Sequence, residues 1–353
     1  MRLLGFREKA WGMSPVSVIL GLTCACFGLY PESAAARYPT SAEFQKPLEI
    51  IAFGSCNDQD DPQPFWPVVE AAGPDLWIWL GDNIYADTRD LTLFRKKYAL
   101  QSAVPEYARF RENVPIIGTW DDHDFGENDA GSEYPHREAA QALALDFLDE
   151  PPDSPRRTQA GLYASYRFGP EGQQVQVILL DTRYHMTTPA KDSTLLGEAQ
   201  WAWLEARLNE VPAEITILGS SIQVVSDEHP WESWARHPHE RARLVKTLAK
   251  SGREGVFFIS GDRHIHELSC WRKAGLGYPL YDLTSSGLTH AWESFEGEAN
   301  RWRLAGPSNQ TGFGLIRIDW EKSPIVITLE VRKTDGSLKF SHSFERPRLS
   351  AGN

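Results

Sequence analysis

The sequence predicts an α/β fold in which β-sheets are flanked by helices and antiparallel strands close the chain. Three observations lead to this prediction. Short apolar runs that end in polar residues recur between residues 47 and 267. Segments with helical periodicity lie between these runs, which favours layered sheets and helices. From about Phe313 the pattern changes to longer runs joined at TDGS, as in an antiparallel meander.

Each strand prediction rests on a short run of β-branched and aromatic residues. The predicted strands lie within residues 47–56, 74–85, 114–124, 175–185, 214–223 and 255–267. In two other segments the apolar residues recur three and four positions apart, which predicts helices within residues 136–150 and 197–210. No repeat of fixed period interrupts this order, so we expect one domain over residues 48–345 and a tail over 346–353.

The first 36 residues have the order of a secretory signal peptide: a basic end, an apolar middle and the small residues Ala34 to Ala36. We therefore expect cleavage after Ala36, export to the periplasm or the extracellular space, and a short linker over residues 37–47. An uncleaved membrane anchor is the alternative, although Gly, Ser and Pro interrupt the apolar stretch. Cys24 and Cys26 lack a convincing lipobox, which argues against a lipid anchor.

Charge and composition exclude some classes of partner. The chain has 36 Lys and Arg residues against 48 Asp and Glu residues, and removal of residues 1–36 leaves 33 against 46, a net charge of −13. An acidic chain without a local basic strip is not expected to bind nucleic acid. With 353 residues, of which 41% are hydrophobic, the chain can bury a large core. We expect a monomer.

After cleavage the chain keeps two cysteines, Cys56 and Cys270. A disulfide between them is one interpretation for an exported protein. The other is that Cys56 serves as a thiolate ligand of a metal ion.

Residue types that bind metals follow several of the predicted strands. They are Cys56, Asp82, Asp122, His123, Asp262 and His264. In open α/β sheets such strand ends meet at one edge, where ligands bind. The segment DDHDFGEND crowds carboxylates around His123, and these would repel one another unless cations neutralised them. We therefore expect a metal site.

Each motif also has a simpler explanation when it is taken alone. Asp82 could cap a helix, and Tyr85 could be a core aromatic residue. The acidic segment could be a solvated loop. His264 and His266 could share one face of a strand as core histidines. The metal hypothesis is favoured because all of these explanations would have to hold at once.

The motifs together resemble the PhoD-type alkaline phosphatases of the calcineurin-like metallophosphoesterase superfamily. The resemblance rests on FGSC, LGDNIYAD, TWDDHDFGEND, LLDTRYH, LGEAQWAWL, GDRHIHEL and LTSSGLTH, in this order between residues 48 and 345. It implies a layered metallophosphoesterase fold and two adjacent cations, Fe³⁺ and Ca²⁺, although other divalent metals could bind. Cysteine in the first motif and Gly-Asp-x-His in the last are the forms typical of the PhoD type.

The resemblance implies a role for each site residue. Asp82 would bridge both ions. Cys56, Tyr85 and His264 would complete the iron site, and Asp122 and Asp262 the calcium site. His123 would lie beside the phosphate as the acid, oriented by Asp124. Less specific candidates are Arg183, which could contact phosphate or pair with a carboxylate, and Asn128, Asp129, Asp87, Arg263 and His266.

The residue types also fit phosphoryl chemistry without the family. Two cations about 4 Å apart can clamp a phosphoryl group and generate hydroxide, which would attack phosphorus in line. A protonated His123 would then assist the leaving oxygen. We therefore expect a secreted phosphoesterase that hydrolyses phosphate monoesters, diesters or both at alkaline pH.

Two other functions remain open from the residues. One is acyl or peptide hydrolysis with Cys56 as nucleophile and His123 as base. The other is a metal-stabilised binding protein without turnover. The substrate, whether a small phosphate ester, a phospholipid or a polymer, would depend on loops at 86–113, 184–196 and 226–240. The Trp- and His-rich segment at 229–241 could line a substrate cleft or close over the core.

Overall fold

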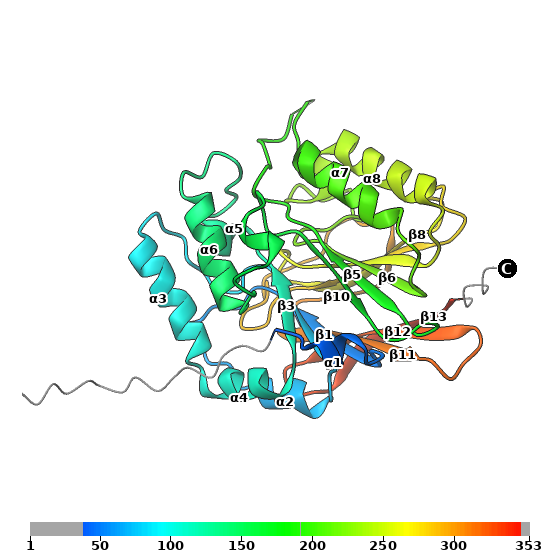
Figure 1. Cartoon of the computed structure of the whole chain (residues 1–353), viewed down its shortest axis with the longest axis horizontal. Coiled ribbons are helices and arrows are strands. Elements are labelled where there is room, and N and C mark those ends of the chain that lie inside the picture. Colours follow the sequence, from blue (N-terminus) through cyan, green and yellow to red (C-terminus); the bar gives the residue numbers. More distant parts are fainter. Residues whose placement is uncertain (1–37, 191, 347–353) are drawn as a thin grey trace, which may run out of the picture. The chain divides into compact units, whose positions relative to one another are not determined.

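Two β-sheets pack face to face, and each carries helices on its outer face (Figure 1). The computed structural model describes residues 38–190 and 192–346. These residues belong to one compact unit. The predicted signal peptide at 1–36 and nearly all of the predicted tail at 346–353 lie outside the described residues. No helix in the described part of the chain is both long and apolar enough to cross a bilayer.

The first sheet has the strand order β13-β12-β11-β1-β2-β3. Its first three strands in the chain are parallel, and β11 pairs antiparallel with β1 in the register Ile50↔Arg317. The strands are β1 (Ile50–Gly54), β2 (Leu76–Leu80), β3 (Ile116–Thr119), β11 (Gly312–Asp319), β12 (Ile325–Lys333) and β13 (Leu338–Arg346). The last three form an antiparallel meander, which confirms the expected C-terminal strands.

The second sheet has the order β10-β8-β9-β7-β6-β5-β4. Its centre is parallel and its other pairings are antiparallel. The strands are β4 (Ala164–Phe168), β5 (Val175–Leu179), β6 (Ile215–Gly219), β7 (Val256–Ser260), β8 (His266–Trp271), β9 (Leu280–Ser285) and β10 (Arg303–Ser308). The α/β class predicted from the sequence is therefore confirmed.

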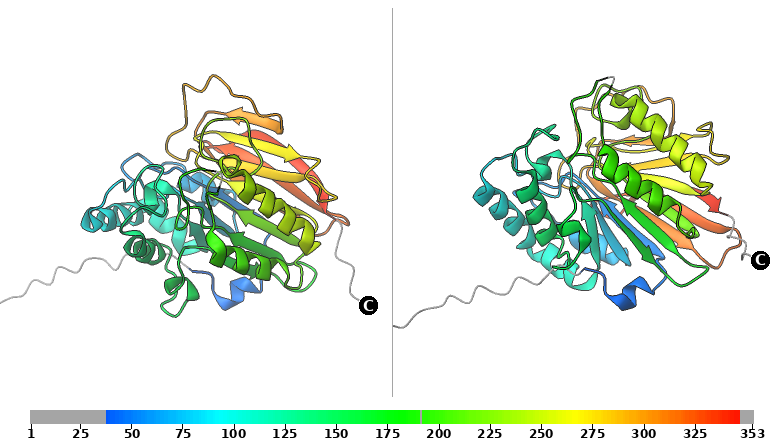
Figure 2. Two further views of the ribbon diagram at one scale, coloured as in Figure 1. Left: turned by 90° about the horizontal axis from the view of Figure 1, so that it is seen from above. Right: turned by 45° about the horizontal axis from the view of Figure 1, so that its top comes forward.

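The helices divide between the two outer faces, as Figure 2 shows for α7 and α8 on the second sheet. The helices are α1 (Ser41–Phe44), α2 (Trp66–Ala71), α3 (Leu91–Ser102), α4 (Pro105–Asn113), α5 (Asp122–Phe125), α6 (Arg137–Phe147), α7 (Gly197–Leu208) and α8 (Pro238–Ser251), with 3₁₀ turns η1 (Pro155–Arg157) and η2 (Trp234–Arg236). The helices expected within 136–150 and 197–210 are present as α6 and α7.

The alternation of side chains along β2 shows how one strand serves two cores. Trp77 and Trp79 pack against the helices of the first sheet, whereas Ile78 and Leu80 face the second sheet. Successive residues of a strand point to opposite faces, so a continuous apolar run is required where both faces are covered. This is the physical reason that LWIWL reads as an uninterrupted apolar segment.

Two local expectations from the sequence were wrong. The strand expected within 255–267 is two strands, because the chain turns after β7 and returns as β8, so His264 and His266 do not share a strand. The region 86–113 is not a long loop, because α3 and α4 occupy most of it. The expected linker at 37–47 contains α1, whose Phe44 stacks on Phe168 with 4.9 Å between ring centroids.

His237 gives the fold a defined pH response. Its ring is 2% exposed, its Nδ1 lies 2.9 Å from Ser193 Oγ, and burial lowers its pKa to about 4. The unfolded state therefore binds more protons below about pH 6.5, and stability falls as the pH drops toward 4.

We expect the free energy of unfolding to fall by about 1–2 kcal/mol more in the parent than in His237→Asn between pH 7 and pH 5. Urea unfolding at both pH values measures this difference. The neighbouring His239 is exposed, so His239→Asn is the control and should respond to pH as the parent does. An identical pH response in His237→Asn would contradict the assignment.

Candidate metal centre

Loops that follow four strands meet at one edge of the two sheets. Cys56 lies two residues after β1, Asp82 two after β2, Asp122 three after β3 and Asp262 two after β7. The loop from the second sheet lies directly against that from the first, since a Cβ at Gly261 would come 2.5 Å from Ser55 Oγ. A larger residue at Gly261 would separate the two halves of the site.

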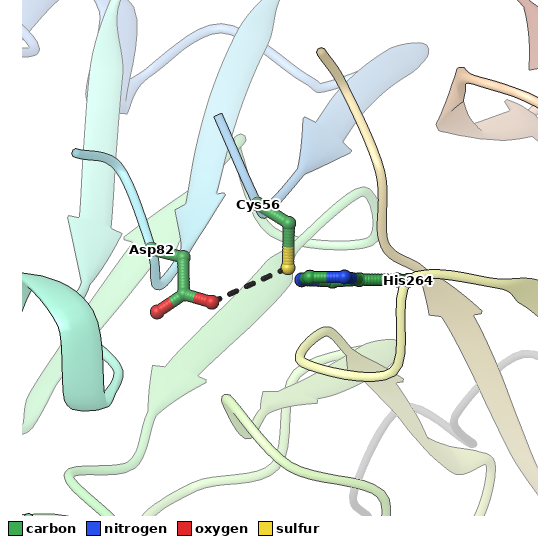
Figure 3. A group of neighbouring side chains, drawn as sticks. All are labelled: Cys56, Asp82 and His264. Atoms are coloured by element: carbon green, nitrogen blue, oxygen red, sulfur yellow. Dashed lines mark hydrogen bonds between the residues drawn. The ribbon is translucent and has the colours of Figure 1, made fainter. Parts of the chain in front are cut away.

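The potential ligand atoms fall into overlapping groups, within each of which they lie no more than 4.8 Å apart. Cys56, Asp82 and His264 form the first group, and Figure 3 shows their side chains converging, with 3.4 Å between Cys56 Sγ and Asp82 Oδ2. Other groups are Asp82 with Asp122 and His123, and Asp121 with Asp122 and Asp262. Asp82 belongs to two groups and Asp122 to three, so both carboxylates lie where the groups overlap.

Tyr85 extends the first group. Its hydroxyl lies 3.0 Å from His264 Nε2 and 3.5 Å from Asp82 Oδ2. The structure therefore brings together all six residues that the resemblance implied as ligands. Cys56 and Cys270 are both free and buried, so they form no disulfide.

The backbone at this edge is strained. Cys56, Asp82, Asp262 and His264 all have positive φ angles, between 48° and 68°. This region is uncommon for residues with a Cβ and costs about 1–3 kcal/mol per residue. Such strain at four candidate ligands indicates that side-chain placement here is maintained at the expense of stability.

The electrostatics of the group call for positive charge. Burial raises the pKa of Cys56 to about 12. Burial, together with the charges of Cys56 and neighbouring aspartates, raises the pKa of Asp82 well above its ordinary value. Burial and the charge of Asp121 do the same for Asp262. Cations bound here would favour the ionised forms and remove this penalty.

Unsatisfied oxygens agree with a fit for cations. Asp121 Oδ2 and Asp122 Oδ1 are buried and have no hydrogen-bond partner, a costly arrangement for carboxylates. Thiol, phenol and imidazole ligands on one side and carboxylates on the other match two ions of different hardness.

His123 is held by Asp87, not by Asp124 as we expected. His123 Nδ1 lies 2.7 Å from Asp87 Oδ1. Burial disfavours the charged ring, but Asp87 and the charge of Asp122 outweigh this effect, so the pKa of His123 is raised. Since Nδ1 is engaged, Nε2 is the nitrogen that remains for a ligand in the pocket.

Asp124 instead fixes the loops that carry the ligands. It is fully buried and accepts hydrogen bonds from the backbone N–H groups of Asp82, Asn83 and Asp121, at 3.0, 3.2 and 2.7 Å. Asp124 can therefore orient Asp82. Its carboxylate accepts from backbone N–H groups, and the ring of His123 pairs with Asp87 instead.

Arg183 pairs with carboxylates, which is the second of its two expected roles. Its side chain is 0% exposed and lies 2.5 Å from Asp121 Oδ1 and 2.6 Å from Glu232 Oε2. Its Nη2 is 3.7 Å from Asp122 Oδ1. Arg183 does not line the metal pocket, so the expected contact with phosphate is not supported. It acts as a fixed counter-charge beneath the aspartates.

The sequence did not single out Glu232 or Ser286. Glu232 lines the pocket and forms a group with Asp122 and Asp129, and burial raises its pKa to about 7. Ser286 Oγ lies 3.0 Å from Cys56 Sγ and accepts the N–H of His264 at 2.6 Å. Ser286 lies in the LTSSGLTH motif, but serine alone carries no ligand signal.

Of the remaining candidates, three line the pocket and His266 lies in the core. Asn128 and Asp129 line the pocket, and the Asp129 N–H donates to Asp122 Oδ2 at 2.6 Å. Arg263 also lines the pocket. His266 is buried in β8 and points to β11, with Gly312 packed against Nε2, so it is a core histidine and does not line the pocket.

A family model described as PhoD-like phosphatase matches residues 51–297. The chain belongs to the PhoD-like phosphatase family. The matched span contains every residue of the metal centre, from Cys56 to His264. It ends before β11, so the C-terminal meander lies outside the matched family region.

Solved structures support the fold. A structure titled as that of PhoD matches with a TM-score of 0.71 at 17% identity, over 88% of this chain and 73% of that one. GAP50, described as the anchor in the inner membrane complex of Plasmodium, matches with 0.58 at 14% identity, over 86% and 90%. A dimetal phosphatase from Danio rerio matches with 0.50 at 13% identity, over 85% and 100%. No curated protein matches the chain.

The PhoD-like phosphatase family and the clustered ligands together support a metal-dependent phosphoesterase. The recognition of the PhoD type from sequence motifs is therefore confirmed. Because the identities to the solved structures are low, these matches support the fold but do not identify the substrate.

Removing the charge of Arg183 should destabilise the folded protein. We expect Arg183→Met to lower the free energy of unfolding by about 3–5 kcal/mol, because it leaves buried carboxylates without their counter-charge. Urea unfolding measures the loss. Arg109→Met is the matched control, since Arg109 pairs with Glu70 at 55% and 29% exposure and should cost at most about 1 kcal/mol. Equal, small losses in both variants would show that Arg183 is not needed there.

Proposed function

We propose that the protein is a secreted phosphoesterase that uses Fe³⁺ and Ca²⁺ to hydrolyse phosphate monoesters, diesters or both at alkaline pH. The observation that carries this proposal is the arrangement of His123. Its ring lies beside Asp82 and Asp122 but is held through Nδ1 by Asp87, and it lines the pocket into which the ligand groups open.

The bound ions would supply Lewis acidity, neutralise the phosphate charge and lower the pKa of bound water. The chain supplies the remaining parts. Asp82, which belongs to two ligand groups, would help to hold both ions. Arg183 pairs with the carboxylate of Asp121, and Asp124 accepts the backbone N–H of Asp82, so both residues help to hold the aspartates in place. Asp87 raises the pKa of His123 and so favours the protonated ring, and with Nδ1 held by Asp87 it is Nε2 that would donate to the leaving oxygen.

The alternative with Cys56 as nucleophile is disfavoured. The thiol is 0% exposed, and burial raises its pKa to about 12, whereas nucleophilic cysteines have lowered pKa values and partial exposure. A binding protein without turnover is also disfavoured, because structural ligation alone would not need the Asp87–His123 pair at the mouth of the site.

Metal analysis combined with hydrolysis assays tests the two-metal proposal. We expect iron and calcium near one each per chain and turnover of chromogenic phosphate esters that is lost on chelation; comparing mono- and diester substrates ranks the two classes. Cys56→Ser should lose iron, because a soft thiolate ligand is removed. Cys270→Ser is the matched control, since Cys270 is buried in β8 away from the centre, and it should retain iron. A protein without metal or turnover, even after reconstitution, would sink the proposal.

The role of His123 as an acid predicts a second result. His123→Ala should lower kcat about 10²–10⁴-fold, the usual contribution of general acid catalysis. Asp87→Asn should lower the pKa of His123, so activity that needs the protonated ring should decline at a lower pH than in the parent. The measurement is the alkaline limb of the pH–rate profile.

Asp90→Asn is the control for the pH profile. Asp90 lies close to Asp87 in the chain but caps α3, with its carboxylate accepting the N–H of Thr92 at 2.8 Å. Asparagine is an equally good cap, so this variant should keep the profile of the parent. If Asp87→Asn also keeps it, His123 does not act as the acid through Asp87.

A further inference from the structure

The lining of the metal pocket is both acidic and aromatic. The cavity has a volume of about 310 Å³. Asp82, Asp122 and Asp262 line it together with His123 and His264. Trp231, Trp292 and Arg263 line the same cavity, and we call these three residues the aromatic wall. The volume is at the lower end of the range for small-molecule sites.

Trp231 presents its indole to the pocket. It is 47% exposed, whereas six other tryptophans are almost completely buried. Its ring meets that of Trp292 nearly at a right angle, with 5.3 Å between centroids and 87° between planes, and Phe295 supports Trp292 from behind at 5.1 Å. Trp231 therefore contributes partly exposed aromatic surface to the cavity that the aspartates also line.

Arg263 fixes the wall to the metal-binding loop. Its Nη2 donates to both Glu298 oxygens, at 2.7 and 2.9 Å, and its Cζ lies 5.7 Å from the Trp231 centroid and 5.9 Å from that of Trp292. Its side chain is 4% exposed, and its Nε has no hydrogen-bond partner. The backbone N–H of Trp292 also donates to the backbone oxygen of His264 at 2.8 Å. The wall is therefore built onto the loop that carries Asp262 and His264.

We propose that the aromatic wall binds the organic group of the substrate and selects a planar aromatic ring. This inference rests on the proposed phosphoesterase function and adds the substrate class. With phosphate at the aspartates, its ester substituent would lie in the same cavity as Trp231 and Trp292. A flat ring can stack on the indole of Trp231, and a saturated ring of similar size gains less from that face. The buried cation of Arg263 is attracted to the faces of the rings around it.

Matched ligands test the proposal without depending on turnover. Benzylphosphonate and cyclohexylmethylphosphonate have the same charged head and rings of similar size, but only one ring is planar and aromatic. We expect the metal-loaded protein to bind benzylphosphonate more tightly. Trp231→Leu should weaken this binding roughly 5- to 100-fold, as in other stacking sites, and should leave cyclohexylmethylphosphonate within about twofold. Titration calorimetry measures both.

The control is Trp203→Leu. Trp203 is half-buried on α7 and packs against Tyr163, so it is a tryptophan outside the pocket. It should leave both affinities unchanged. Equal affinity of the parent for the two phosphonates, or equal loss of both in Trp231→Leu, would overturn the wall as an aromatic subsite.

Hydrolysis separates this inference from the proposed function. Benzyl phosphate and cyclohexylmethyl phosphate, or their methyl diesters, share the same type of leaving oxygen. Preference for the benzyl ester in the parent that is lost in Trp231→Leu supports both proposals. If the parent hydrolyses both esters at equal rates, the aromatic subsite is contradicted and the phosphoesterase activity is supported. If the parent binds benzylphosphonate selectively but hydrolyses neither ester, the aromatic subsite is supported and the phosphoesterase activity is contradicted.

Discussion

The site depends on how the chain tolerates four aspartates in one buried volume. Asp82, Asp121, Asp122 and Asp262 come from loops of two different sheets, and burial penalises their negative charge. Arg183 offsets part of this charge. At Asp122 its positive charge, the charge of His123 and backbone hydrogen bonds together outweigh burial and lower the pKa. The remaining negative charge is what gives the pocket its affinity for cations.

The same constraint explains the surrounding structure. Backbone groups are directed onto Asp124 so that the β2 and β3 loops cannot move apart, and Ser286 ties the loops of Cys56 and His264 together. The positive φ angles at the ligands are accepted because the side chains must converge. A fold optimised for stability alone would have relaxed these loops. Here the rigid strands position them, and the loops carry the chemistry.

Much of this could be predicted from the sequence, for identifiable reasons. The strands that lead to Cys56, Asp82 and Asp122 are continuous apolar runs, which is a local signal, and the ligands follow them at once. The partner of His123 could not be predicted, because Asp124 is its neighbour in the sequence, whereas Asp87 lies 36 residues away and only the fold brings it to the ring. Glu232 was missed because it does not directly follow a strand: β6 ends at Gly219, whereas Asp262 comes two residues after β7. The segment at 229–241 satisfies both of its open interpretations, since Trp231 lines the cleft and Trp234 is buried in the core.

The order of the strands sets when β1 acquires both of its neighbours. β1 lies near the start of the described chain between β2 and β11, and its Ile51 pairs with Ile316. During synthesis the strand that precedes Cys56 can therefore pair with β2 early, but it lacks its other neighbour until β11 has been made. Non-local pairing of this kind is slow, because a long loop must close first. A chain shortened before β11 would leave one edge of β1, the strand that leads to Cys56, unpaired.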